Sequence, residues 1–147
     1  MSVTATSLSE ATRSSIKAQV ESGAGFPRLP HVPYSPFVKL TPEEQEANLL
    51  HVALWVVERA GDSFDMKQWH GLRIGSEVVA VPSYSQHRCN TTHCIAGFAE
   101  VMSNNVYVNC GTENAGAMLL GLEAYSHFLD TNEDGLEFLK EVIARNS

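Results

Sequence analysis

The segment between Thr41 and Gly61 constrains the fold of this chain more than any other. Thr41 lies three residues before Glu44, the spacing of a capping box in which each side chain accepts a hydrogen bond from the other residue's backbone N–H. In the stretch 49–57 only His51 is polar. A helix of that composition has no polar face to offer to water. We therefore expect a helix that Gly61 ends and that is buried on most sides.

Weaker patterns predict the elements that surround this helix. Apolar residues at helical spacing and capping residues predict helices over about 8–21, 94–102, 115–120 and 122–129, and a last one capped by Thr131 with Asp134. Runs of β-formers predict strands at 77–81 and 106–108. The expected fold class is mainly α (α+β), a compact bundle of about four to five helices with a small two-stranded β element.

Prolines recur every three residues before this domain. We therefore divide the chain in two. Residues 1–37 are expected to form an N-terminal helix followed by a proline-rich extended arm, and residues 38–147 a single globular, mainly helical domain. Three residues is the polyproline II period, so the rings would line one edge of the arm. We expect the arm to dock on its own domain or on a second copy; an SH3-type groove is the alternative, although Arg28 lies one residue too close to the next proline. The prolines are Pro27, Pro30, Pro33 and Pro36.

Composition excludes several functions. The 147 residues include 10 Lys+Arg and 17 Asp+Glu, a net charge of −7, which argues against binding to nucleic-acid phosphates. The longest apolar run, 52–57, is far shorter than the roughly 20 residues of a membrane span. Three cysteines, an odd number, do not form a disulfide framework, and the N-terminus has no stretch of signal-peptide type. We therefore expect a soluble, cytoplasmic protein.

The segment 87–94 holds the residues best suited to chemistry. If Thr91 or Thr92 caps the following helix, Cys94 lies in its first turn, where the helix dipole favours a thiolate. Cys94 would then be the nucleophile of a small thiol hydrolase, with His70, His87 or His93 as its base.

Zinc binding is the second interpretation of this segment. His87, Cys89, His93 and Cys94, together with His70 or Cys110, offer enough nitrogen and sulfur ligands for a tetrahedral site, although the spacing lacks a CxxC or HxxxH half. The third interpretation, which the apolar stripe starting at Cys94 favours, has Cys94 in the core and the histidines on the loop surface.

The stretch C-x-T-x-x-C-I-A-G-F-A at 89–99 resembles a signature found in small bacterial and phage proteins without an established activity. In these proteins the C-x-T-x-x-C-I-A-G motif is followed by an aromatic residue or histidine and then alanine. F-D-M-x-x-W at 64–69 and L-L-G-L at 119–122 agree with the resemblance, which covers roughly 45–130. It implies that the two cysteines and the Ala-Gly step form one structural unit, in a phage or mobile-element setting.

An acidic segment near the C-terminus fits a calcium-binding loop. Residues 130–141 match D-x-[DN]-x-[DN]-G-x5-E, with Asp130, Asn132, Asp134 and Glu141 as ligands. The same residues also suit the start of a helix capped by Thr131. The two interpretations exclude each other, because a helix that starts at 132 cannot wrap around an ion, and the absence of a second loop favours the helix.

The chain shows no Gly-rich phosphate loop, no serine nucleophile elbow and no paired carboxylates in an identifiable cleft. We therefore expect a non-enzymatic accessory or interaction protein, with no resident cofactor. Its expected partner is another protein, or a second copy in a homodimer, bound through the proline-rich arm. The alternatives are the Cys94 hydrolase and a domain that binds zinc or calcium.

Overall fold

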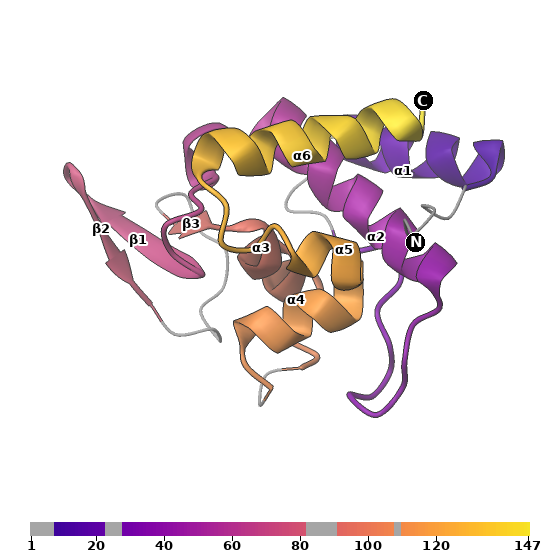
Figure 1. Ribbon diagram of the computed structural model, residues 1–147, viewed down its shortest axis with the longest axis horizontal. Helices are drawn as coiled ribbons and strands as arrows, with labels where there is room; N and C mark the ends of the chain where they lie inside the picture. The colour runs from indigo at the N-terminus through magenta and orange to yellow at the C-terminus, as the bar shows by residue number, and fades with distance from the viewer. Residues whose placement is uncertain (1–7, 23–27, 82–90, 108–109) are drawn as a thin grey trace.

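The computed structural model describes residues 8–22, 28–81, 91–107 and 110–147. Helix α2 (Pro42–Trp55) runs through the middle of the molecule and continues as a π-helical turn, Val56–Ala60, and a 3-10 turn, Gly61–Ser63 (Figure 1). The capping box is present: the Glu44 N–H donates to Thr41 Oγ1 over 3.2 Å and the Thr41 N–H donates to Glu44 Oε1 over 2.9 Å. Every residue from 46 to 54 is buried. This confirms the expected buried helix for 49–54, whereas Val57, at the end of the apolar stretch, is 37% exposed.

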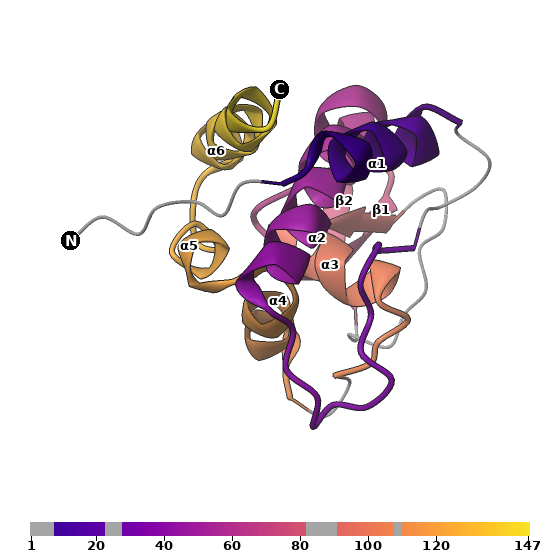
Figure 2. The same ribbon diagram turned by 90° about the vertical axis from the view of Figure 1, so that its right-hand side faces the viewer.

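The other helices surround α2. Helix α1 (Glu10–Ser22) and helix α6 (Asn132–Arg145) both pack against α2 and lie above it in Figure 2. Helices α3 (Ile95–Met102), α4 (Thr112–Leu120) and α5 (Leu122–Tyr125) form a second group, in which α3 and α4 pack closely together. The predicted mainly helical α+β class is confirmed, with six α-helices in the described residues where four to five were expected.

The β element has three antiparallel strands, in the order β2 (Glu77–Ala80), β1 (His70–Ile74), β3 (Thr91–His93). Leu72 of β1 pairs with Val79 on one side and with Thr91 on the other. Strand β2 was expected, whereas β1 and β3 were missed because neither carries a run of β-forming residues. The strand predicted at 106–108 is wrong for Val106 and Tyr107, which lie in a turn; residue 108 is outside the described residues.

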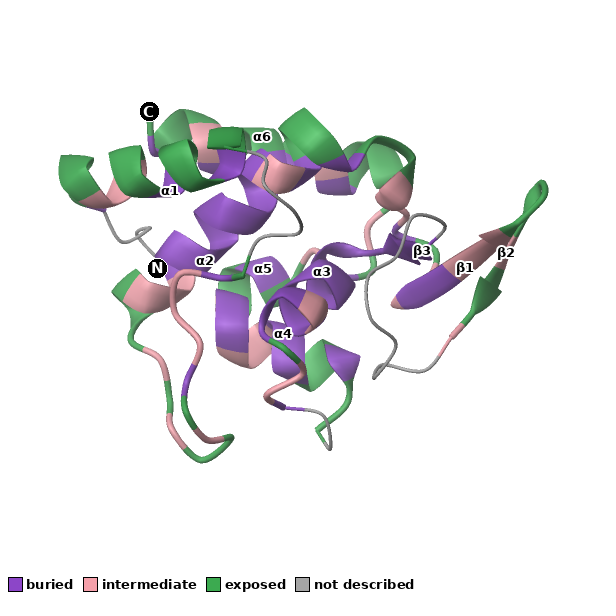
Figure 3. Ribbon diagram, turned by 180° about the vertical axis from the view of Figure 1, so that it is seen from behind, coloured by how far each residue is buried: buried purple, intermediate pink, exposed green. Residues whose placement is uncertain are grey.

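One hydrophobic core joins these elements. Figure 3 shows its buried residues along α2, α3 and α4 and on the inner sides of α1 and α6. Ile16 and Val20 of α1 are fully buried in it, and Leu29, just before the first described proline, is 4% exposed. None of the helices in the described ranges is both long and apolar enough to cross a bilayer.

Candidate functional site

Four polar side chains from four elements meet inside the core. His70 of β1 faces His93 of β3, with 2.9 Å between their Nδ1 atoms. On its other side, His70 Nε2 lies 2.6 Å from Oε1 of Glu100 on α3. The hydroxyl of Thr112, the first residue of α4, donates to the same carboxylate oxygen over 2.8 Å. None of these four side chains is appreciably exposed, and we call them the buried polar cluster.

The hydrogen bonds of the buried polar cluster form one continuous chain. A hydrogen bond between two imidazole nitrogens needs one donor and one acceptor, so a single proton lies between the Nδ1 atoms of His70 and His93. Glu100 Oε1 accepts from both His70 and Thr112, while Glu100 Oε2 has no hydrogen-bond partner among the described residues. The cluster is therefore a chain of directed bonds that joins the sheet to α3 and α4.

Sequence reasoning placed His93 in this region but missed the partners of the cluster. The expectation that the histidines of the 87–94 loop lie on its surface is wrong for His93, which is 0% exposed; His70, from outside that loop, is 2% exposed. One signal was available: Glu100 is the only charged residue in the apolar helix Ile95–Met102, and a carboxylate in such a helix is buried only when it is paired. Its partners could not be named, because His70 lies 30 residues away along the chain.

Cys94 is a buried thiol at the N-cap of α3. Its Sγ accepts from the Gly97 N–H over 3.4 Å and lies 3.8 Å from the Trp69 carbonyl oxygen. The side chain is 1% exposed, and burial raises the pKa of the thiol to about 12, although the backbone N–H groups of the helix start act in the opposite direction. At neutral pH the group is protonated, so the arrangement offers a hydrogen-bonded core residue rather than a thiolate nucleophile.

The other residues predicted to bind zinc or to act in catalysis do not come together in the described part of the chain. His87 and Cys89 lie outside the described residues, and the described residues contain no group of three or more His, Cys, Asp or Glu side chains arranged to hold a metal ion. The described residue Cys110 is exposed, whereas Cys94 is buried. Of the residues named for zinc, the structure brings together His70 and His93.

The acidic segment 130–141 forms the start of α6. Thr131 is the N-cap and accepts from the Asp134 N–H over 3.1 Å, as the capped-helix interpretation predicts. Two of the residues named for calcium have other partners: Asp130 Oδ2 lies 2.7 Å from His127 Nδ1, and Asn132 Oδ1 accepts from the Met66 N–H over 2.6 Å. In this conformation Asn132, Asp134 and Glu141 lie on α6, and the three carboxylates named for calcium form no group that could hold a metal ion.

The proline-rich arm is a loop that the core holds at both legs. We call residues 28–40 the arm loop; Figure 1 shows it projecting below α2. It does not run extended to Phe37, because the chain reverses in a turn in which the Val38 N–H donates to the Ser35 carbonyl over 3.2 Å. Pro36 occupies the second position of this turn, where its fixed φ is favourable. The regular proline spacing obscured the Ser-Pro turn signal.

Asn48 of α2 fixes the first leg of the arm loop. Its Oδ1 accepts from the His31 N–H over 2.9 Å, and its Nδ2 donates to the His31 carbonyl over 2.8 Å and to the Leu119 carbonyl over 3.1 Å. The Asn48 side chain is fully buried. The second leg is held by the hydroxyl of Tyr107, which donates to the Val38 carbonyl over 3.1 Å.

The tip of the arm loop presents two aromatic rings to solvent. Tyr34 is 91% exposed and Phe37 is 92% exposed, the two highest values among the exposed large apolar residues of the described chain. Hydrogen bonds hold both legs of the loop to the core, so the two rings at its tip remain exposed as an apolar surface of the kind that marks interaction sites. The aromatic tip, Tyr34 with Phe37, is therefore the most conspicuous exposed apolar feature of the described residues.

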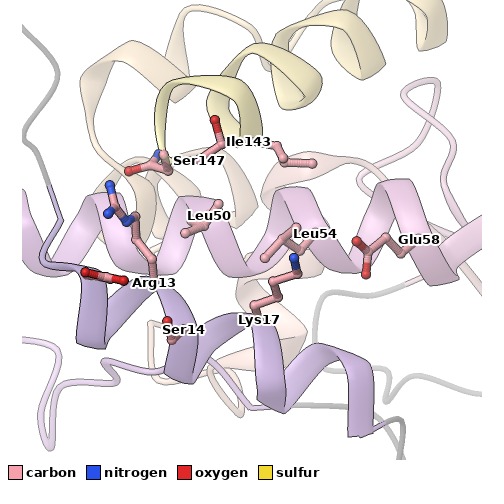
Figure 4. Close-up of a pocket in the computed structure, with 10 residues that line it drawn as sticks. Arg13, Ser14, Lys17, Leu50, Leu54, Glu58, Ile143 and Ser147 are labelled. Carbon is pink, nitrogen blue, oxygen red and sulfur yellow. The ribbon is translucent and has the colours of Figure 1, made fainter.

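A cleft of about 380 Å³ opens between α1, α2 and α6 (Figure 4). Its floor is apolar, formed by Leu50 and Leu54 of α2. Its rim carries two basic and two acidic side chains, so their charges balance and select no ligand class: Arg13, Lys17, Glu10 and Glu58.

Comparison of the chain with known protein families, with curated proteins and with solved structures finds no match.

Proposed function

We propose that this chain is a non-enzymatic interaction protein that binds a protein partner through the aromatic tip of the arm loop. The observation that carries the proposal is the combination of two rings that are over 90% exposed with two legs that the core holds in place. The region richest in chemical side chains, the buried polar cluster with Cys94, is enclosed in the core and supports a structural role.

The geometry of the tip suits recognition. Aromatic residues bury 150–250 Å² each, and tyrosine is enriched among the residues that dominate binding energies. Because Asn48 and Tyr107 already hold the legs, binding would order little additional chain. The partner that fits is a protein with an apolar pocket that accepts both rings.

The setting of this interaction is also part of the proposal. We place the protein in the cytoplasm, because an odd number of cysteines without a disulfide framework suits a reducing compartment. The resemblance of the segment 89–99 points to a phage or mobile-element process.

Photocrosslinking tests the interaction whichever protein the partner is. A photoreactive phenylalanine is placed at Tyr34 or at Phe37 in the full chain, and at Asp62, whose side chain is 93% exposed, as the control. After irradiation in extract of the native host, a discrete protein adduct is expected from positions 34 and 37 and not from position 62. Excess unlabelled chain should suppress the adduct, whereas excess Tyr34→Ser/Phe37→Ser chain should not. Absence of an adduct at both arm positions, or an equal adduct at position 62, would overturn the proposal.

A further inference from the structure

We propose that the partner of the arm loop is a second copy of this chain, in a symmetric dimer in which the aromatic tip of each copy packs on the α5 surface of the other. This inference rests on the proposed function and names its partner. It is carried by a second exposed apolar surface, by where that surface lies, and by the charges around both.

The second surface lies on and just after α5. Leu122 is 81% exposed, Leu129 is 88% exposed and Tyr125 is 42% exposed. The chain continues past α5 in tight turns, in which the Phe128 N–H donates to the Tyr125 carbonyl over 3.2 Å, so Leu122 and Tyr125 lie on α5 and Leu129 lies in the turn that follows it. We call these three residues the α5 surface.

The first leg of the arm loop and the end of α4, which leads into α5, are both bound to α2. Asn48 bonds both to His31 in the first leg and to Leu119 near the end of α4, three residues before α5 begins. Gln45, one turn earlier on α2, donates from Nε2 to the Met118 carbonyl over 3.0 Å. A tip and a receiving surface on elements that share an anchor on α2 suit a two-fold axis, because each copy then gives its tip and receives its partner's in one closed contact.

The charges around the two surfaces are opposite in sign. The arm loop contains Arg28 and Lys39, both exposed, and no Asp or Glu. The segment 112–130, which includes the α5 surface, contains Glu113, Glu123 and Asp130 and no Lys or Arg. Arg145 of α6 lies 2.8 Å from Glu123, but it also pairs with Glu46, so the acidic side chains still outnumber the basic one there. Two chains of net charge −7 repel each other in most orientations, so the arrangement that brings the arm loop against α5 is the one that local charge favours.

Sedimentation velocity over a concentration series tests the dimer on the full chain. The wild-type chain is expected to dimerise, and both Tyr34→Ser/Phe37→Ser and Leu122→Ser/Leu129→Ser are expected to be monomeric, each with a wild-type circular dichroism spectrum. Ile74→Ser is the matched control, because Ile74 is 59% exposed on the β-hairpin, and it should dimerise like wild type. Lys39→Glu should weaken the dimer, with a smaller dependence on salt than wild type shows.

A mixing experiment tests the reciprocal contact directly. The Tyr34→Ser/Phe37→Ser chain retains an intact α5 surface, and the Leu122→Ser/Leu129→Ser chain retains an intact tip. An equimolar mixture of the two monomers should therefore form heterodimers held by one of the two contacts. Their dissociation constant should exceed that of the wild-type dimer.

The outcomes separate this inference from the proposed function. A monomeric wild-type chain whose position-34 adduct contains a different protein overturns the second copy and leaves the interaction function standing. A monomeric chain without any adduct overturns both. A dimer that survives both double variants, or that Ile74→Ser disrupts, shows that the copies meet elsewhere and overturns the inference. Failure of the mixed variants to associate excludes the exchange of tips.

Discussion

At the scale of single residues, two buried histidines differ in whether their ring nitrogens have hydrogen-bond partners. Both ring nitrogens of His70 have hydrogen-bond partners, His93 and Glu100. His51, on α2, is fully buried, and neither of its ring nitrogens has a hydrogen-bond partner among the described residues. Burial therefore disfavours its charged form and lowers the pKa of His51 to about 4.

His51 should make the protein sensitive to acid. Because its folded pKa lies below the value of about 6.5 in the unfolded chain, the unfolded state binds the extra proton as pH falls from about 6.5 to 4. Its contribution is present above pH 6.5 and decreases by about 3 kcal/mol across this window. His51→Leu should remove that part of the pH dependence, measured by urea unfolding at several pH values. A wild-type slope in His51→Leu would contradict the prediction.

Cys94 should be unreactive in the folded protein. A thiol with a pKa of about 12 and 1% exposure has almost no accessible thiolate near neutral pH. Iodoacetamide at neutral pH, followed by peptide mass spectrometry, should label the exposed Cys110 and leave Cys94 unmodified until urea is added. Rapid native labelling of Cys94 would instead support the hydrolase interpretation.

At the scale of elements, two helical glycines have opposite surroundings. An added Cβ at Gly97 of α3 would lie 1.9 Å from the Trp69 carbonyl oxygen, a backbone atom that cannot move aside cheaply. An added Cβ at Gly135 of α6 would lie 3.2 Å from Cγ of the flexible Met66 side chain. Gly97 therefore allows α3 to approach the backbone before β1. Gly135 lowers the stability of α6 relative to alanine and permits no comparable close approach of another backbone.

Alanine substitutions at Gly97 and Gly135 should change the free energy of unfolding in opposite directions. Gly97→Ala should lower the free energy of unfolding by at least 3 kcal/mol, about the upper range of core overpacking. Gly135→Ala should raise it by up to about 1 kcal/mol, the helix propensity difference between glycine and alanine. Urea unfolding measures both.

Calcium provides the contrasting measurement. In a calcium loop Gly135 is the sharp-turn residue, so alanine there would weaken binding. If the capped helix is correct, calcium and chelator leave the melting temperature of wild type and of Gly135→Ala unchanged. A calcium-dependent rise in wild type that Gly135→Ala abolishes would establish the calcium loop.

At the scale of the whole molecule, the buried polar cluster connects the sheet to the helical body. The Asp65 N–H donates to the His93 carbonyl over 3.0 Å, and His70 and His93 reach Glu100 and Thr112 through side chains. The rest of the core is mainly apolar, apart from buried polar residues of α2 such as Asn48 and His51. A directed polar cluster at the junction specifies how the sheet is oriented, which apolar contact alone does not.

Variants of the cluster should be strongly non-additive. Glu100→Leu leaves His70 Nε2 and the Thr112 hydroxyl without their acceptor and should cost about 3–5 kcal/mol in the free energy of unfolding. His70→Leu should also be destabilising, and the double variant should cost about 1–3 kcal/mol less than the sum, because both changes break the same bond. Glu137→Leu, at an exposed position of α6, should stay within about 0.5 kcal/mol of wild type. Additive effects in urea unfolding would contradict the coupling.

The sequence alone determined what depends on neighbours along the chain. The capping box at Thr41, the burial of 49–54, the Thr131 cap and the apolar side of α3 all follow from residues within about one or two helical turns of each other. Only the tertiary structure decided that His70, His93, Glu100 and Thr112 meet, that Asn48 clamps the arm loop, and that burial outweighs the helix N-terminus at Cys94. The physical reason is that hydrogen bonding between distant segments and the loss of water around a side chain are properties of the packed chain, whereas capping and periodicity are properties of a few consecutive residues.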